Sequence, residues 1–507
     1  MNRRDFLSRL VAGAGALAVT PSLLRAEIAA SSAGSVAAFN AAQRQYSWLV
    51  GWKGVADQRF EPSLAQVEGK IPADLRGVLY RNGPAMFERA GQRYQHWFDG
   101  DGLMHAWNIS DGGIRHQARL VETFKLQTER RAGRFVIPAA GTTISDPIEI
   151  RNNDDTNTAN TSVVQIAGKV YALWEAGSAI ELDPESLATI GPKAWRDDLT
   201  AAPFSAHPIR DRDGTIWNFG LLSMLGGSGL MIWKIKPDGQ LDTIQIVEDK
   251  QQGYLHSFAM SENHLIFVMA PYAMGEEGSF FERMKFQPNL PCRIAVVSKK
   301  ALDKPRWFDA DFAMAYHFAD AFEQGDEIVV RAARHIDLSE ARSPRANLMR
   351  GKVDAPHPTP PQLVTLTINL RKGDARWRST GINPIEFPLF DPRARSAKES
   401  ILYAPTSAGK SDAPFTNAVT AIDLHRERQS VHRYGEKIMA EEHVFVPKPG
   451  STKAGQGWLI GSLLDHGKQC SGIAILDAER VEAGPLATAW LDQVYPLGFH
   501  GTFAGQS

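Results

Sequence analysis

The stretch His256-Ser-Phe-Ala-Met-Ser-Glu-Asn-His-Leu-Ile-Phe-Val268 runs from a histidine through a polar turn into an apolar strand. Two further stretches, starting at His207 and His317, repeat this order. Their turns fall at Asp213-Gly214 and Gly325-Asp326. Because turn residues between β-rich runs mark hairpins, each stretch predicts the first two strands of an antiparallel sheet.

Seven segments of the chain share the position of these histidines. They are Ala159-Asn160-Thr161, Ala206-His207-Pro208, Leu255-His256-Ser257, Tyr316-His317-Phe318, Ile385-Glu386-Phe387, Glu442-His443-Val444 and Phe499-His500-Gly501. Counted at residues 160, 207, 256, 317, 386, 442 and 500, they are separated by 47, 49, 61, 69, 56 and 58 residues. One propeller blade per step fits this spacing, so the sequence predicts an all-β, seven-bladed β-propeller.

The last segment, around His500, has no hairpin partner after it, and the first unit lacks a strand of this kind. The simplest arrangement lets the C-terminal strand complete the N-terminal blade, which closes the ring and removes sheet edges. Three stretches do not fit blades and are expected to cover one face: 131–150, 271–291 and 343–361.

Equivalent strands of a propeller line its axis, so His207, His256, His317 and His500 are expected to converge there. Neutral imidazoles suit Fe, Zn, Cu or Ni. Three carboxylates, Glu175, Glu386 and Glu442, lie in the same or adjacent predicted strands. Since ligating histidines usually donate their second N–H to a carboxylate or carbonyl, these glutamates are candidate supports of a metal site.

The net charge and the cysteine content of the chain bear on its partners and on disulfide bridges. The chain has 507 residues, 43% of them hydrophobic and 22% charged, and a formal charge of −1, so it carries no basic footprint for nucleic acid. Only two cysteines, Cys292 and Cys470, are present, and the sequence leaves open whether they are bridged.

The N-terminus has the pattern of an export signal. Arg3-Arg4-Asp5-Phe6-Leu7 precedes a short apolar stretch of small residues. Residues 1–26 therefore predict a twin-arginine signal, with a general secretory signal or an uncleaved anchor as alternatives. Residues 27–45 are expected to form a linker, and residues 46–507 a single propeller domain. We accordingly expect a periplasmic protein.

Several motifs resemble those of the carotenoid cleavage oxygenases, over about residues 65–503. They are Arg81-Asn82-Gly83-Pro84, Phe98-Asp99-Gly100-Asp101-Gly102, Ala159-Asn160-Thr161, Leu173-Trp174-Glu175-Ala176, Phe204-Ser205-Ala206-His207-Pro208, Phe445-Val446-Pro447 and Gly498-Phe499-His500-Gly501. Among members, this chain is most similar in its motifs to bacterial apocarotenoid oxygenases.

The resemblance implies one Fe(II) per chain, held by His207, His256, His317 and His500 on the axis, and an apolar tunnel under a dome of loops. It implies that Glu175, Glu386 and Glu442 support three of the ligands and leave His207 without a carboxylate. It also implies that the methyl group of Thr161 shields an open iron position. The activity expected is cleavage of one C=C bond of a carotenoid or apocarotenoid by O2, giving two carbonyl products. An apolar polyene comes from a membrane, so peripheral membrane contact is expected.

Other functions stay open. The lignostilbene-cleaving branch of the family grips a phenol with a tyrosine and a lysine; residues 143–160 contain no lysine, although Lys125 lies nearby. This counts weakly against a stilbene substrate. A metal-containing propeller that only binds an apolar ligand, and a hydrolase or isomerase on the same fold, are the remaining alternatives.

Overall fold

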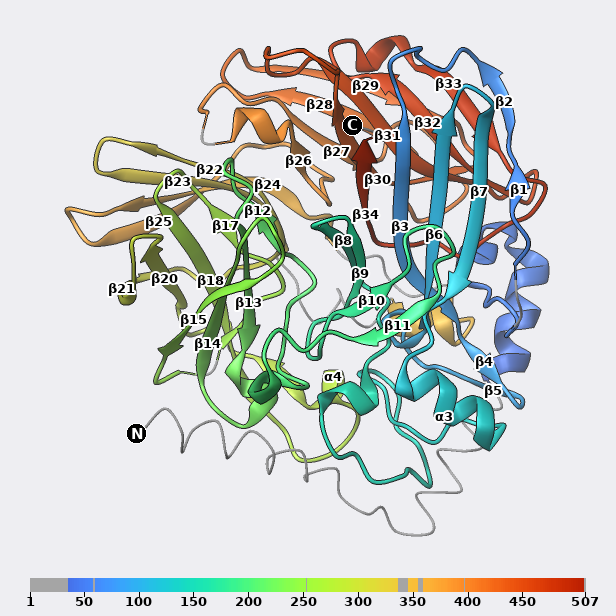
Figure 1. Cartoon of the computed structure of the whole chain (residues 1–507), viewed down its shortest axis with the longest axis horizontal. Helices are drawn as coiled ribbons and strands as arrows, with labels where there is room; N and C mark the ends of the chain where they lie inside the picture. Colours follow the sequence, from blue (N-terminus) through green and yellow to red (C-terminus); the bar gives the residue numbers. More distant parts are fainter. Residues whose placement is uncertain are drawn as a thin grey trace.

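The computed structural model of the chain describes residues 35–57, 60–251, 253–335, 345–353, 359–395 and 397–505. Seven antiparallel sheets fan around a common centre, which confirms the predicted seven-bladed propeller (Figure 1). The predicted export signal lies outside the described residues. Residues 35–45, expected to be linker, are helical. No helix in the described ranges is long and apolar enough to cross a membrane.

Blades two to six follow the chain in simple order. Blade two consists of β8 (Ser162–Ile166), β9 (Lys169–Leu173), β10 (Ile180–Leu182) and β11 (Thr189–Pro192), and blade three of β12 (Ile209–Arg210), β13 (Ile216–Leu221), β14 (Gly229–Ile235) and β15 (Leu241–Glu248). Blade four consists of β17 (Ala259–Met260), β18 (His264–Met274), β20 (Cys292–Ser298) and β21 (Ala301–Ala310), with β16 (Gly253–Tyr254) and β19 (Met284–Phe286) added to β18.

Blade five consists of β22 (Met314–Gln324), β23 (Glu327–His335), β24 (Gln362–Asn369) and β25 (Asp374–Ser379). Blade six consists of β26 (Leu389–Phe390), β27 (Leu402–Thr406), β28 (Ala418–Asp423) and β29 (Arg428–Arg433). The turns expected between the first two strands are present. Gly214 and Gly325 have φ values of +85° and +61°, the left-handed region that glycine enters without strain.

The ends of the chain are joined in two blades. In blade one, β34 (His500–Gly505) pairs with β3 (Gly77–Met86), which is followed by β6 (Asp101–Ser110), β7 (Gly113–Leu120) and β1 (Ser63–Leu64). This confirms that the C-terminal strand completes the N-terminal blade. Blade seven consists of β30 (Ile438–Pro447), β31 (Gly457–Asp465), β32 (Cys470–Asp477) and β33 (Pro485–Trp490), and its outer strand is the N-terminal β2 (Gln66–Gly69). The second connection was not anticipated from the sequence.

The repeated histidine segment is less regular than predicted. His317, Glu442 and His500 lie within first strands, whereas the other segments come just before a strand. Glu175 lies two residues beyond the end of β9 and is not in a strand. The ring of first strands still forms, since β34 contacts β8 and β30, and β22 contacts β17 and β26.

The described parts of the non-blade stretches form short helices and loops, and residues from all three stretches line one large cavity. Helix α3 (Phe124–Ala132) begins at Thr123, whose hydroxyl accepts the Leu126 N–H, and α4 (Phe280–Arg283) begins with a capping box at Ser279. The stretch 271–291 contains less loop than predicted, because its first four residues continue β18. Short pieces complete the chain: the hairpin of β4 (Glu88–Arg89) and β5 (Gln92–Arg93), and the 3-10 helices Ser47–Trp52, Trp97–Asp99, Asn153–Thr156, Asp197–Leu199, Leu222–Leu225, Pro392–Ala394 and Val481–Ala483.

The core lies between neighbouring blades. The largest cluster joins blades three, four and five through residues such as Phe219, Phe267 and Ile328. Both cysteines, Cys292 and Cys470, are buried and free, so the open question of a bridge is answered: there is none. Burial raises the pKa of the Cys292 thiol to about 11 and keeps it protonated.

Candidate metal centre

Four histidines from four blades meet at the centre of the ring. One ring nitrogen from each of His207, His256, His317 and His500 lies within 4.8 Å of the others. The Nε2 atoms of His207 and His256 are 2.8 Å apart, and those of His317 and His500 are 3.2 Å apart. Two imidazole nitrogens bound at about 2.1 Å and at right angles to one ion would be about 3 Å apart. The four side chains therefore fit a single metal ion.

The charge state of the rings suits this purpose. Burial lowers the pKa of His207 well below its ordinary value, and the neighbouring histidines lower it further. Burial also lowers the pKa of His500, to about 4, although Glu442 opposes the shift. Neutral imidazoles offer the lone pair that a metal needs, so these residues are ready to bind at neutral pH.

Three glutamates hold three of the rings from behind. His256 Nδ1 contacts Glu175, His317 Nδ1 lies 2.5 Å from Glu386, and His500 Nδ1 lies 2.8 Å from Glu442. A carboxylate on Nδ1 takes the proton of that nitrogen and leaves Nε2 free for a metal. Among the described residues, no carboxylate pairs with His207, as the resemblance implied.

Glu386 and Glu442 stay ionised although they are largely shielded from solvent. Burial would raise the pKa of Glu386, but His317 and His335 outweigh it and hold this pKa well below its usual range. Burial likewise opposes ionisation of Glu442, and His500 and Arg81 again lower its pKa. Each carboxylate therefore remains an acceptor at neutral pH.

Thr161 lies on the wall beside the histidines and is 9% exposed. Its hydroxyl donates to Asn160 Oδ1 at 3.0 Å, and its N–H donates to Leu173 O. Asn160 in turn donates to the carbonyls of Phe98 and Gly100. With its hydroxyl engaged, Thr161 is fixed in one rotamer.

Two supports were missed from the sequence although their motif was noticed. Arg81 Nη1 donates to Glu442 Oε2 at 2.7 Å, and Asn82 Nδ2 donates to the carbonyls of Ala159 and Ser162. Both side chains are buried in β3. An arginine and an asparagine side by side in an apolar strand were the available signal, because such residues are buried only when they are paired.

His335 is a further unanticipated neighbour of the site. Its Nε2 lies 2.6 Å from Glu386 Oε1, so one carboxylate connects His317 and His335. The backbone N–H of Phe387 donates to Glu386 Oε2 at 2.7 Å. Phe387 has a φ of +47°, a strained value for a residue with a side chain, and its ring stacks on His317 at 4.6 Å.

His256, His317 and His500 line a cavity of about 1020 Å³. Residues of the face-covering stretches and of several blades line it, and large apolar side chains predominate: Trp52, Trp97, Phe98, Trp174, Phe280, Phe281, Leu348, Val353, Ile385, Phe387, Phe415 and Phe499. A second cavity, of about 610 Å³, reaches His207, His317 and His500 between first-strand residues such as Val164 and Met260.

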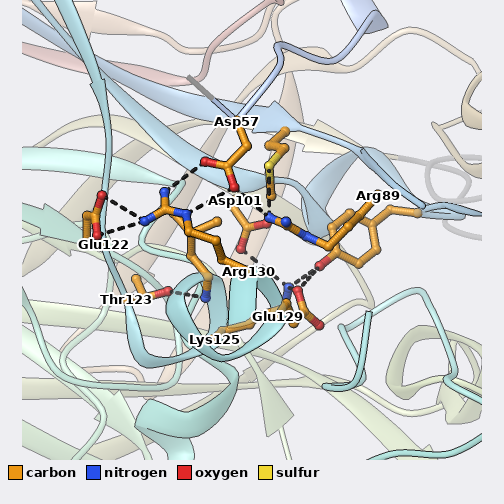
Figure 2. Close-up of polar contacts among 11 residues, drawn as sticks. Asp57, Arg89, Asp101, Glu122, Thr123, Lys125, Glu129 and Arg130 are labelled. Carbon is orange, nitrogen blue, oxygen red and sulfur yellow. Dashed lines mark hydrogen bonds and ion pairs between the residues drawn. The ribbon is translucent and has the colours of Figure 1, made fainter. Parts of the chain in front are cut away.

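Lys125 is not among the residues that line the large cavity of about 1020 Å³. It is fully buried, contacts the Tyr94 hydroxyl, and donates to Glu129 Oε2 at 2.9 Å (Figure 2). Asp101 and Glu129 raise the pKa of Lys125 although burial opposes this. Glu129 also accepts the N–H groups of Val136 and Ile137, which precede the wall residues Pro138 to Ala140. A buried tyrosine–lysine pair is thus present outside residues 143–160.

These features define a propeller protein whose cluster of four histidines, a candidate metal site, opens into an apolar cavity. A family model described as retinal pigment epithelial membrane protein (RPE65) matches residues 55–505. The chain therefore belongs to this family, the carotenoid cleavage oxygenases, whose members include iron-dependent dioxygenases that act on carotenoids and apocarotenoids.

Individual relatives agree with this assignment. The chain is 28% identical to the apocarotenoid-15,15'-oxygenase of Synechocystis, over 91% of this chain and 97% of that protein. It is 27% identical to resveratrol cleavage oxygenase 1 of Aspergillus fumigatus, over 83% and 88%. The crystal structure of cobalt-substituted Synechocystis apocarotenoid oxygenase superposes with a TM-score of 0.81 and 26% identity, covering 91% of this chain and 98% of that one.

Proposed function

We propose that this protein is a non-haem iron dioxygenase that cleaves one C=C bond of an apocarotenoid or carotenoid with O2, giving two carbonyl products. The observation that carries the proposal is the convergence of four histidines, three of which line a large apolar cavity. We assign one Fe(II) to His207, His256, His317 and His500, a set of donors that suits a divalent transition metal.

Each residue of the site then has a defined task. Glu175, Glu386 and Glu442 hold the Nδ1 protons of three ligands, and Arg81 orients Glu442. Thr161, with its hydroxyl held by Asn160, would use its methyl group to shield an open position of the bound metal. Aromatic side chains position the conjugated substrate and exclude water. Bound iron would supply the activation of dioxygen.

A stilbene-type activity is the second candidate, and one observation favours it. The lignostilbene-cleaving branch grips the phenol of its substrate with a tyrosine and a lysine, and Tyr94 and Lys125 are in contact here. The weak argument against stilbenes from the lack of lysine in 143–160 therefore no longer applies. Against this candidate, Lys125 is already paired with Glu129 and does not line the cavity.

Product analysis separates the candidates. The iron-loaded protein would be incubated under 18O2 with apocarotenoids, full-length carotenoids and hydroxystilbenes. We expect two carbonyl products from an apocarotenoid, each labelled with 18O. Preferred cleavage of hydroxystilbenes, lost in Lys125→Met, would replace the proposal with the second candidate. Bound iron without oxygen uptake would indicate a binding protein, and an unlabelled product a hydrolase or isomerase.

We further propose that the chain is exported in folded form by a twin-arginine signal and meets its substrate at a membrane surface. The support is the sequence of residues 1–26 and the apolar character of the cavity. Replacing Arg3 and Arg4 together by lysine is expected to retain the protein in the cytoplasm. Unchanged periplasmic recovery would point to the general secretory route. Sedimentation with phospholipid vesicles tests the membrane contact.

A further inference from the structure

The acidic and basic side chains in the wall of the large cavity differ in whether they have partners. Every carboxylate of the wall has hydrogen-bond partners: Asp99, Glu175, Glu386, Glu441 and Glu442. By contrast, Arg283, Arg345 and Lys352 line the cavity and form no ion pair with any described residue. The charge left available in this apolar space is therefore positive.

Arg345 is the cation best placed to meet a ligand. Its guanidinium carbon lies 5.0 Å from the ring centroid of Phe98 and 5.5 Å from that of Tyr316. Its Nη1 is buried and has no hydrogen-bond partner in the described parts of the chain. Stacking on aromatic rings engages the faces of a guanidinium but leaves the N–H groups at its edge unsatisfied. A buried charged donor without an acceptor is costly, which favours a ligand oxygen there.

Tyr316 supplies a second donor on the same wall. Tyr316 is 3% exposed, and its hydroxyl has no hydrogen-bond partner within the described ranges. The ring lies 5.5 Å from that of His256 and 4.9 Å from that of His335. Tyr316 therefore connects the position of Arg345 with the immediate surroundings of the histidine cluster.

We propose that Arg345 and Tyr316 form a subsite for the oxygen-bearing end of the substrate, a carboxylate or a carbonyl, with the carboxylate bound more tightly. This inference rests on the proposed function and adds the chemical class of the substrate. An apocarotenoid acid or aldehyde has such an end and a hydrocarbon carotenoid does not. Because Tyr316 adjoins His256, the polar end is held on the wall that leads to the cleaved bond.

Binding measurements test the subsite without requiring turnover. Trp52, Trp97 and Trp174 line the cavity, so a bound polyene quenches tryptophan fluorescence. Three polyenes of equal length would be titrated into the iron-loaded protein: a carboxylic acid, the matching aldehyde and the matching hydrocarbon. In Arg345→Met we expect the Kd of the acid to rise about 10- to 100-fold, the effect of losing a hydrogen bond to a charged group. The Kd of the hydrocarbon should stay within about twofold.

Two further variants sharpen the result. Tyr316→Phe should weaken the acid and the aldehyde about 2- to 10-fold each, because a single hydroxyl is removed. Arg350→Met is the matched control: Arg350 belongs to the same short segment but bonds Gln95 Oε1 at 3.0 Å and does not line the cavity. It should leave all three Kd values unchanged.

The outcomes separate the subsite from the proposed function. Equal weakening of acid and hydrocarbon in Arg345→Met, or no weakening of either, overturns the subsite while wild-type cleavage still supports the oxygenase. Failure of the wild type to bind or cleave any polyene overturns both.

Discussion

Replacing Glu442 and Glu386 by glutamine should affect the metal site to different extents, although the two carboxylates have the same task. Glu442 Oε2 accepts from Arg81 Nη1 and from the Gly501 N–H, and Oε1 accepts from His500 Nδ1. Arginine and backbone N–H groups can only donate, so the glutamine oxygen must take the Oε2 position. The NH2 group then faces His500 Nδ1.

His500 has two responses in Glu442→Gln, and both weaken the metal site. It can keep its Nδ1 proton against an NH2 group, which leaves a buried donor unpaired at about 1–3 kcal/mol. Alternatively it can move the proton to Nε2, which removes the lone pair that would bind iron. We expect iron affinity to fall about 10- to 100-fold, or about 1.4–2.7 kcal/mol.

Glu386→Gln should cost less because His335 can adapt. The glutamine oxygen takes the Oε2 position, where His317 Nδ1 and the Phe387 N–H donate. The NH2 group then faces His335 Nε2. His335 is not among the four converging histidines, so it can move its proton to Nδ1 and accept, and iron affinity should fall less than about tenfold.

Chelator competition on the purified variants measures the difference, with thermal stability recorded in parallel. Glu323→Gln is the matched control: Glu323 pairs with His264 at 3.0 Å and with Ser261 and Asn263, and with none of the four converging histidines, so this variant should retain all iron. Equal iron loss in Glu442→Gln and Glu386→Gln would refute the role assigned to Arg81 and Gly501 in orienting the amide.

Three other outcomes are expected. His256→Ala should lose iron and activity, because it removes one of the four converging nitrogen donors. His466 bonds Ser47 through Nδ1 and is not among those donors, so His466→Ala should retain both. Full iron content in His256→Ala would sink the ligand assignment. Hydrogen bonds from Ser261 and Asn263 outweigh burial and lower the pKa of Glu323 from 4.5 to about 2. The ionised carboxylate therefore stabilises the fold above about pH 4.5, and this stabilisation is lost as the pH falls toward 2. The urea midpoint of Glu323→Gln should lie below that of the wild type at pH 7 and approach it at about pH 2.5. Removing iron should leave the β-sheet circular dichroism intact, because blade packing is independent of the histidines. Restoring iron at about 100 times its Kd should stabilise the fold by about 2.7 kcal/mol. Loss of the sheet signal on chelation would contradict this.

The propeller was predictable because its signals are local. Each blade repeats a hairpin with its own turn, such as Asp213-Gly214, and the period of the repeat counts the blades. Once the blades are counted, residues at equivalent positions must lie on the axis, which is why the four histidines could be proposed together. The resemblance in motif then added their roles and those of the glutamates.

The supports around the histidines depend on contacts between distant parts of the chain. Arg81 meets Glu442 across 361 positions, and His335, at the end of β23, meets Glu386, just before β26, across 51. No local pattern specifies such pairs, since they follow from how the blades are packed.

The sequence by itself therefore determined the number of blades, the closing strand and the four histidines, through the periodicity of hairpins and the chemistry of their first residues. Only the tertiary structure decided that β2 completes blade seven, that Tyr94 adjoins Lys125, and that Arg345 stacks on Phe98 in the cavity. The physical reason is that repeat spacing is written along the chain, whereas side-chain partners depend on which surfaces the closed ring brings together.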